Sequence, residues 1–109
     1  MADTSHLSVA QMRENASEAT AMLRLLAHED RLLLLCQLSQ EELCVSDLET
    51  LLAIRQPTLS QQLGVLRREE LVATRRQGKH IYYRIADESV LALLQTLYEL
   101  YCQPQGEIS

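Results

Sequence analysis

The stretch PTLSQQLGVLRREE, residues 57–70, decides the fold. Leu59, Leu63 and Leu66 recur at helical spacing, which predicts an amphipathic helix with one buried leucine face. Pro57 suits the first helical position, because the N–H that it lacks would be unpaired there. The opposite face and its edges carry small and polar side chains, namely Pro57, Thr58, Ser60, Gln61, Gly64 and Arg68. An exposed face of this kind can enter a groove.

The segments on either side of this helix are also patterned. Ser46 and Glu49 have the spacing of a capping box, which predicts a short helix from residue 46 through residue 53. Residues 71–76 and 80–85 are strand-like runs around Gln77-Gly78-Lys79, which predicts a β-hairpin with a basic tip. Two helices joined by a tight turn and followed by a basic hairpin indicate a winged helix-turn-helix.

Three further helices complete the predicted fold. Ser8 and Gln11 have capping-box spacing before a helix that runs to residue 27, and residues 28–38 form a helix apolar nearly all round. Asp87 should cap a last helix that extends to residue 101. We expect a mainly α fold with a β-hairpin wing in the order ααααββα. It should form one domain over residues 1–109, with tails at 1–7 and 103–109.

Composition excludes several classes of protein. The 109-residue chain is 47% hydrophobic, too apolar for a disordered chain. No apolar stretch approaches the roughly 20 residues that a membrane span needs, and the first residues lack a signal sequence, so we expect a cytoplasmic protein without a membrane partner. Three cysteines in a reducing compartment do not predict a disulfide framework.

Positive charge is concentrated in the predicted helix-turn-helix and wing. The chain has a net charge of −5, yet seven of its ten Lys and Arg lie between residues 55 and 84, beside only two of its fifteen acids. These cations are Arg55, Arg67, Arg68, Arg75, Arg76, Lys79 and Arg84. A basic patch on an acidic protein predicts a nucleic-acid partner.

Known modes of DNA recognition assign roles to these side chains. Arg68, Arg75, Arg76 and Lys79 are predicted to lie at the DNA backbone, where arginine and lysine bind phosphate. The predicted base readers have amide or hydroxyl groups and lie near the start of the recognition helix: Gln56, Thr58, Ser60 and Gln61. One such module makes few contacts, so we expect a homodimer, paired through its terminal helices, on an inverted-repeat duplex.

Three stretches resemble the ArsR/SmtB family of transcriptional repressors. They are LAHEDRL at residues 26–32, TLSQQLGVLR at 58–67 and RQGKHIYY at 76–83. The resemblance covers roughly residues 16–102 and implies a winged helix-turn-helix repressor. Glu29 stands where the family often has proline, and Gln62 where it often has histidine.

Two inducer sites of the family are incomplete in this chain. The arsenite-type site resembles Cys-Val-Cys, whereas this chain has Cys44-Val45-Ser46, in which Ser46 is expected to cap a helix instead. The zinc-type site resembles Asp and His followed by His and Glu, whereas the last helix offers Asp87 and Glu99 with no histidine between them. His6, His28 and His80 lie elsewhere. We therefore expect no metal site and no cofactor.

The positions of Cys36 and Cys102 are similar to those of the dithiol branch of the family. That resemblance implies a repressor released from its operator when reactive sulfur species or oxidants link the two thiols. Taken alone, the position of Cys36 favours a small buried hydrophobe, and only its pairing with Cys102 and the resemblance favour a sensor. One alternative is an arsenite or soft-metal sensor that uses Cys36, Cys44 and Cys102. Another is a winged helix that binds protein rather than DNA. No nucleophile motif or phosphate-binding loop indicates an enzyme.

Overall fold

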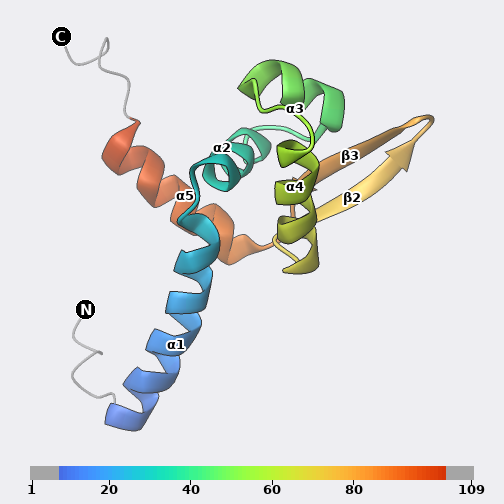
Figure 1. The fold of residues 1–109 in the computed structure, drawn as a ribbon. Coiled ribbons are helices and arrows are strands. Elements are labelled where there is room, and N and C mark those ends of the chain that lie inside the picture. Colours follow the sequence, from blue (N-terminus) through green and yellow to red (C-terminus); the bar gives the residue numbers. More distant parts are fainter. Residues whose placement is uncertain (1–7, 103–109) are drawn as a thin grey trace, which may run out of the picture.

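The computed structural model describes residues 8–102, which form five helices and three strands (Figure 1). In chain order these are α1 (Val9–Leu26), α2 (Glu29–Leu38), β1 (Leu43–Cys44), α3 (Val45–Leu52), α4 (Thr58–Arg68), β2 (Val72–Gln77), β3 (His80–Ile85) and α5 (Glu88–Tyr101). The predicted tails at 1–7 and 103–109 lie outside the described residues. The mainly helical fold with a hairpin wing is confirmed.

The predicted order ααααββα is wrong in one respect, because it lacks β1. Leu43 and Cys44 pair antiparallel with Tyr83 and Tyr82 of β3, which makes a three-stranded sheet in the order β1-β3-β2. A two-residue strand has no periodicity of its own, so only its pairing with β3 defines it.

Helix α3 begins earlier than predicted. Its N-cap is Cys44, and the capping box expected from Ser46 to Glu49 is wrong. The carboxylate of Asp47 reaches back and accepts hydrogen bonds from the backbone N–H of Cys44, at 3.4 Å, and from its thiol, at 3.2 Å. An acidic side chain at the third helical position therefore sets the start of the helix.

Helix α4 starts and ends slightly inside its predicted limits. Pro57 is its N-cap rather than its first helical residue, and the helix ends at Arg68 rather than near residue 70. Glu70 has a φ of 63°, and the N–H of Leu71 donates to the carbonyl of Leu66 at 2.9 Å. A left-handed residue followed by such a bond is a common way to end a helix.

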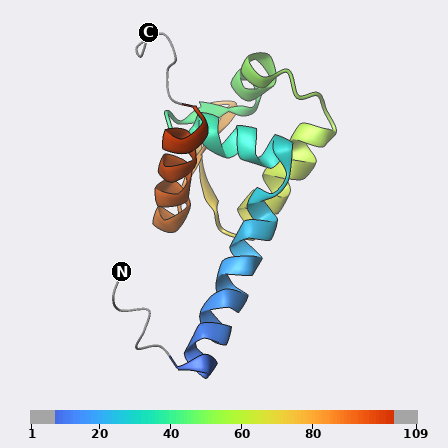
Figure 2. The ribbon, with the colours of Figure 1, turned by 90° about the vertical axis from the view of Figure 1, so that its left-hand side faces the viewer.

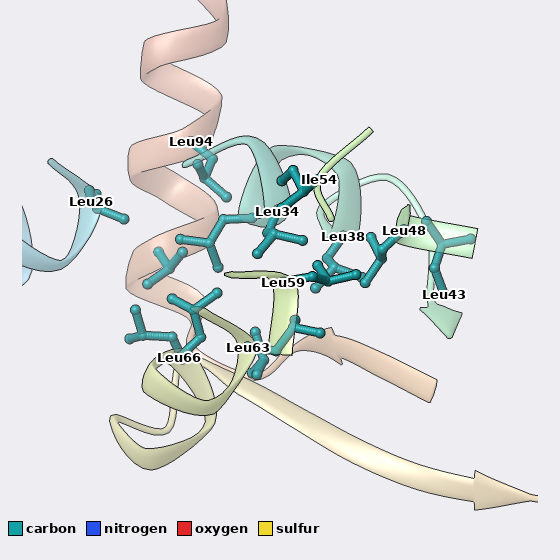
Figure 3. Packing of buried hydrophobic residues seen from close by; sticks show 14 residues of the cluster. Leu26, Leu34, Leu38, Leu43, Leu48, Ile54, Leu59, Leu63, Leu66 and Leu94 are labelled. Carbon is teal, nitrogen blue, oxygen red and sulfur yellow. The ribbon is translucent and has the colours of Figure 1, made fainter. Parts of the chain in front are cut away.

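Leucines from α2, α3 and α4 form half of the buried core cluster (Figure 3). Leu34 of α2, Leu48 of α3 and Leu59 of α4 have no exposed surface, and Leu63 and Leu66 are nearly or fully buried as well. The predicted inward face of α4 is therefore confirmed. Because the leucine face is buried, the opposite, polar face of α4 is directed toward solvent.

The terminal helices are less enclosed than the other helices. Only Leu26 is buried in α1, which extends away from the body of the molecule (Figures 1 and 2). In α5, Val90 and Leu94 are buried, while Tyr98 and Leu100 are exposed. None of the helices in residues 8–102 is long and apolar enough to cross a membrane.

Replacement of Leu48 by alanine should lower the free energy of unfolding by about 2–5 kcal/mol, because it leaves a cavity in the core. Leu51→Ala on the same helix is the matched control, since Leu51 is 55% exposed and its loss should change stability by less than about 1 kcal/mol. Urea denaturation followed by circular dichroism measures both values. Equal losses would contradict this description of the core.

Candidate nucleic-acid interface and cysteine pair

The outer face of α4 presents polar side chains at its N-terminal end. Ser60 and Gln61 are exposed, and Thr58, the first residue of the helix, is half-buried. Gln61 makes no side-chain hydrogen bond to another described residue, so its amide is free to bind a base edge. Arg68 is exposed at the other end of α4.

Gln56 and Ser60 are joined to each other. The side-chain oxygen of Gln56 accepts hydrogen bonds from the Ser60 backbone N–H, at 3.1 Å, and from the Ser60 hydroxyl, at 2.7 Å. Gln56 thus satisfies a donor in the first turn of α4, a role that sequence reasoning missed. The amide NH₂ of Gln56 and the two lone pairs of the Ser60 hydroxyl are left for an outside partner.

The hairpin places two cations close to its tip. Lys79 is exposed in the two-residue turn, and Gly78 before it has a φ of 63°, a conformation that glycine adopts without steric strain. Arg76, also exposed, approaches the turn, and its Nε donates to the Gly78 carbonyl at 3.3 Å. The hairpin extends beyond the rest of the molecule on the side that carries α3 and α4 (Figure 1).

Arg75 is held by neighbouring side chains. Its Nε and Nη2 both lie 2.8 Å from Oε1 of Glu42, and its Nη1 donates to the side chain of Gln77 at 2.6 Å. The guanidinium also lies over the ring of Tyr82, 4.9 Å from the centroid. The hydrogen bond from Arg75 lowers the pKa of the Glu42 carboxyl, and the positive charges of Arg75 and Arg84 add to this effect.

Cys36 and Cys102 line the same groove. It lies between α2 and α5, has a volume of about 830 Å³, and is lined mainly by apolar side chains. Besides the two thiols, the lining includes Leu32, Leu91, Leu94, Leu97, Tyr98 and Tyr101. The fold therefore brings together the two cysteines that are farthest apart in the sequence.

The two thiols differ in their surroundings. Cys36 is half-buried on α2, whereas Cys102 is exposed as the C-cap of α5. Burial raises the pKa of the Cys36 thiol, and repulsion from the Cys102 thiolate raises it further. The second effect requires the two sulfurs to be near each other. Cys102 is thus the more accessible thiol, and Cys36 ionises less readily than an ordinary cysteine.

Cys44 lies apart from this pair. It is buried beside Asp47 at the start of α3 and does not line the groove. Within residues 8–102, no three side chains of His, Cys, Asp or Glu are grouped so that they could hold a metal ion. The set Cys36, Cys44 and Cys102 is therefore not assembled within one chain, and Asp87 serves as the N-cap of α5.

Comparison with known proteins agrees with this geometry. The family described as "Bacterial regulatory protein, arsR family" matches residues 28–74. The Biofilm growth-associated repressor of Agrobacterium fabrum is 46% identical over 106 residues, which cover 97% of this chain and 91% of that protein.

Two solved structures also match along most of the chain. The transcriptional repressor BigR from Xylella fastidiosa has a TM-score of 0.81 at 41% identity, covering 90% of this chain and 100% of that one. Reduced HlyU from Vibrio cholerae has a TM-score of 0.83 at 38% identity, covering 87% and 100%. The chain therefore belongs to the arsR family of bacterial regulators and is a DNA-binding transcriptional repressor, not an enzyme.

Proposed function

We propose that this repressor acts as a single-domain homodimer on an inverted-repeat operator and leaves the DNA when Cys36 and Cys102 become linked. The observation that carries the proposal is the shared groove, where a half-buried thiol on α2 and an exposed thiol on α5 line one apolar surface. The similar solved structure of HlyU in a reduced form supports a thiol-based switch.

The proposed reaction needs an inducer that accepts two electrons. The Cys102 thiolate attacks a hydroperoxide and breaks its O–O bond, which gives a sulfenic acid; Cys36 then attacks that sulfur, expels water and forms the disulfide. With a persulfide RSSH, Cys102 takes the outer sulfur and releases RSH, and attack by Cys36 then releases H₂S. In both cases two thiols lose two electrons and two protons, and the inducer is reduced.

The position of α2 supports a connection between this reaction and DNA binding. Leu34 and Leu35 of α2 are fully buried, and they belong to the same core cluster as Leu59 of α4 (Figure 3). A bond from Cys36 to the end of α5 would pull α5 toward α2. Because packed cores move in discrete steps rather than deforming continuously, the strain would shift α4 or the dimer partner relative to the DNA.

Exposed apolar side chains on the terminal helices support the homodimer. On α1 these are Val9, Met12 and Leu23, and on α5 they are Leu91, Tyr98, Leu100 and Tyr101, the last two being 68% and 79% exposed. An 18-residue helix that packs on its own chain only near its end would be stabilised by a second copy. A dimer of this kind presents two α4 helices to two half-sites.

The proposed DNA surface consists of the outer face of α4 and the hairpin tip. Gln61 is the foremost base reader, with Gln56, Thr58 and Ser60 beside it, while Arg68, Arg76 and Lys79 lie at the backbone. Arg75 also lies on the wing, but its guanidinium already has partners within the chain.

Gln61→Ala should weaken binding to the preferred duplex by about 1–3 kcal/mol and relax the preference at one base pair, because an amide can pair with a single adenine. Lys79→Ala should instead weaken binding to all sequences and flatten the salt dependence by about one unit. Fluorescence anisotropy with duplexes selected from a random library by the wild-type protein measures both effects. Uniform weakening by Gln61→Ala would show that Gln61 is not a reader.

The raised pKa of Cys36 predicts slow alkylation at neutral pH. Because only the thiolate reacts, the rate at Cys36 should rise toward its maximum at a higher pH than for an ordinary cysteine. Cys102→Ser removes the repelling thiolate and should shift this profile to lower pH, whereas Cys44→Ser should not. Iodoacetamide labelling read by mass spectrometry gives the profiles. An unchanged profile in Cys102→Ser would show that the sulfurs are too far apart to interact.

Cys36→Ser and Cys102→Ser should each keep operator binding and abolish release by inducer, because either change removes one end of the link. In the wild-type protein, release should correspond to a 5- to 150-fold loss of affinity, the range of typical allosteric coupling of about 1–3 kcal/mol. Cys44→Ser is the matched control and should still be released. Anisotropy before and after exposure to a persulfide or a peroxide measures the change.

Three results of this experiment would contradict the proposal. Release of Cys36→Ser by persulfide would place the sensor at other residues. Release of the wild-type protein by arsenite, with tight arsenite binding that needs all three cysteines, would favour the soft-metal alternative. A change in mass of the exposed protein, read by mass spectrometry, that does not correspond to a bond between Cys36 and Cys102 would exclude the proposed link.

A further inference from the structure

Most of the wing is a two-stranded ribbon. Strand β1 pairs with β3 only at Tyr82 and Tyr83, so the pairs Arg76–Ile81 and Gln77–His80 lie beyond its support. An isolated two-stranded hairpin is marginally stable in water. The direction of the tip relative to α4 therefore depends on what holds the hairpin at the edge of the three-stranded region.

The pair Arg75–Tyr82 lies at that edge, directly beside Cys44 of β1. Side chains alternate between the two faces of a sheet, so Arg75 shares a face with Tyr82 and with residue 42 just before β1. Arg76 is on the other face. Arg75 and Arg76, which the sequence assigns alike to phosphate binding, are thus directed to opposite sides of the hairpin.

We propose that Arg75 is a positioning residue of the wing and not a phosphate contact, held by Glu42 and Tyr82 so that the hairpin keeps a fixed direction relative to the helix-turn-helix. We call Glu42, Arg75 and Tyr82 the wing latch. This inference rests on the proposed DNA surface, in which the wing tip binds the DNA backbone.

The contacts of the guanidinium carry the proposal. All three nitrogens of Arg75 already lie within 2.8 Å of a side-chain oxygen of this chain, Nε and Nη2 at Glu42 and Nη1 at Gln77. The face of the guanidinium is occupied by Tyr82. The Glu42 carboxylate, whose side chain is 27% exposed, balances the charge of Arg75, whose side chain is 45% exposed. A phosphate that reached the two remaining N–H donors would therefore meet a guanidinium whose charge is already neutralised.

The position of Glu42 in the chain gives the latch its effect. Glu42 immediately precedes β1, and β1 continues into α3 without a loop. Arg75 belongs to β2, which follows α4 after a short turn. The ion pair therefore joins the wing to the segment that leads into the helix-turn-helix, across 33 residues of sequence.

Lys79 provides the comparison for a true phosphate contact. It is exposed at the hairpin turn and forms no ion pair with another residue in the range 8–102. A cation that releases counterions on binding changes the slope of log K against log salt, whereas a residue that only orients the wing changes affinity without changing the slope.

The experiment measures affinity against salt for Arg75→Ala, Lys79→Ala and Glu42→Ala, with the duplex selected by the wild-type protein. Lys79→Ala should flatten the slope by about one unit, while Arg75→Ala should weaken binding and leave the slope unchanged. Glu42→Ala should weaken binding about two- to fivefold, the effect of losing one partly exposed ion pair. Glu41→Ala removes an exposed acid at the adjacent position and should not weaken binding.

A charge exchange tests the latch directly. Arg75→Glu alone sets two carboxylates against each other and should weaken binding, and adding Glu42→Arg should recover part of the loss because the pair re-forms in reverse. A carboxylate at position 75 cannot bind phosphate, so recovery would support the latch. Circular dichroism confirms that each variant is folded.

The possible failures are distinguishable. If Arg75→Ala and Lys79→Ala flatten the slope equally, Arg75 is a phosphate contact and the latch is wrong, while the proposed DNA surface stands. Stronger binding by Glu42→Ala would also overturn the latch, because Glu42 would then only repel DNA. If Lys79→Ala leaves the slope unchanged, the wing does not contact the backbone and both proposals fail.

Discussion

Burial of the leucine face of α4 is the constraint on which the rest of the structure depends. Leu59, Leu63 and Leu66 are fully or nearly fully removed from water, so α4 cannot rotate about its axis without exposing apolar surface. The polar face with Gln61 is directed outward as a consequence. The core therefore orients α4, and no specific interaction on its polar face is needed to do so.

Helix α2 extends this constraint to the cysteine pair. Its buried leucines, Leu34, Leu35 and Leu38, pack in the core, while Cys36 is turned toward the groove beside α5. The position of the thiol is thus as well defined as the core itself. Helix α5 is held near its start by Val90 and Leu94 and carries Cys102 at its other end. Cys36 is therefore held firmly, while Cys102 lies at a less enclosed helix end. This difference suits the proposed link between the two thiols, which has to form and be broken again.

The elements with a periodic apolar pattern could be predicted from the sequence. Those that depend on pairing with a distant segment could not. The five helices and the hairpin follow from apolar periodicity and caps, because each long segment contains its own signal. Strand β1 has two residues and exists only through β3. The N-cap of α3 is Cys44 and not the predicted Ser46, because the Asp47 carboxylate accepts hydrogen bonds from Cys44 and so fixes the start of the helix there.

The candidate site shows the same division. Exposure of Gln61 and Lys79 could be predicted from the helix face and the turn. The positions of Cys36 on the second helix and of Cys102 at the end of the last one followed from the apolar patterns, and their pairing followed from the family resemblance. The contact between Glu42 and Arg75 could not, since 33 residues separate them and neither lies in a motif with the other. A cation in a basic patch looks the same in sequence whether or not an acid neutralises it.

The neutralisation of Glu42 by Arg75 matters because a chain with a net charge of −5 has to bind negatively charged DNA. Glu42 lies at the base of the wing, where an unpaired carboxylate would repel the DNA backbone over a distance of about one Debye length, roughly 8 Å at physiological salt. Arg75 and Arg84 both lower the pKa of Glu42, so the carboxylate remains ionised while its field is cancelled nearby. Glu42 is paired with Arg75 of β2, so this ion pair links the segment before β1 to the opposite edge of the sheet, in addition to the two ladder pairs between β1 and β3.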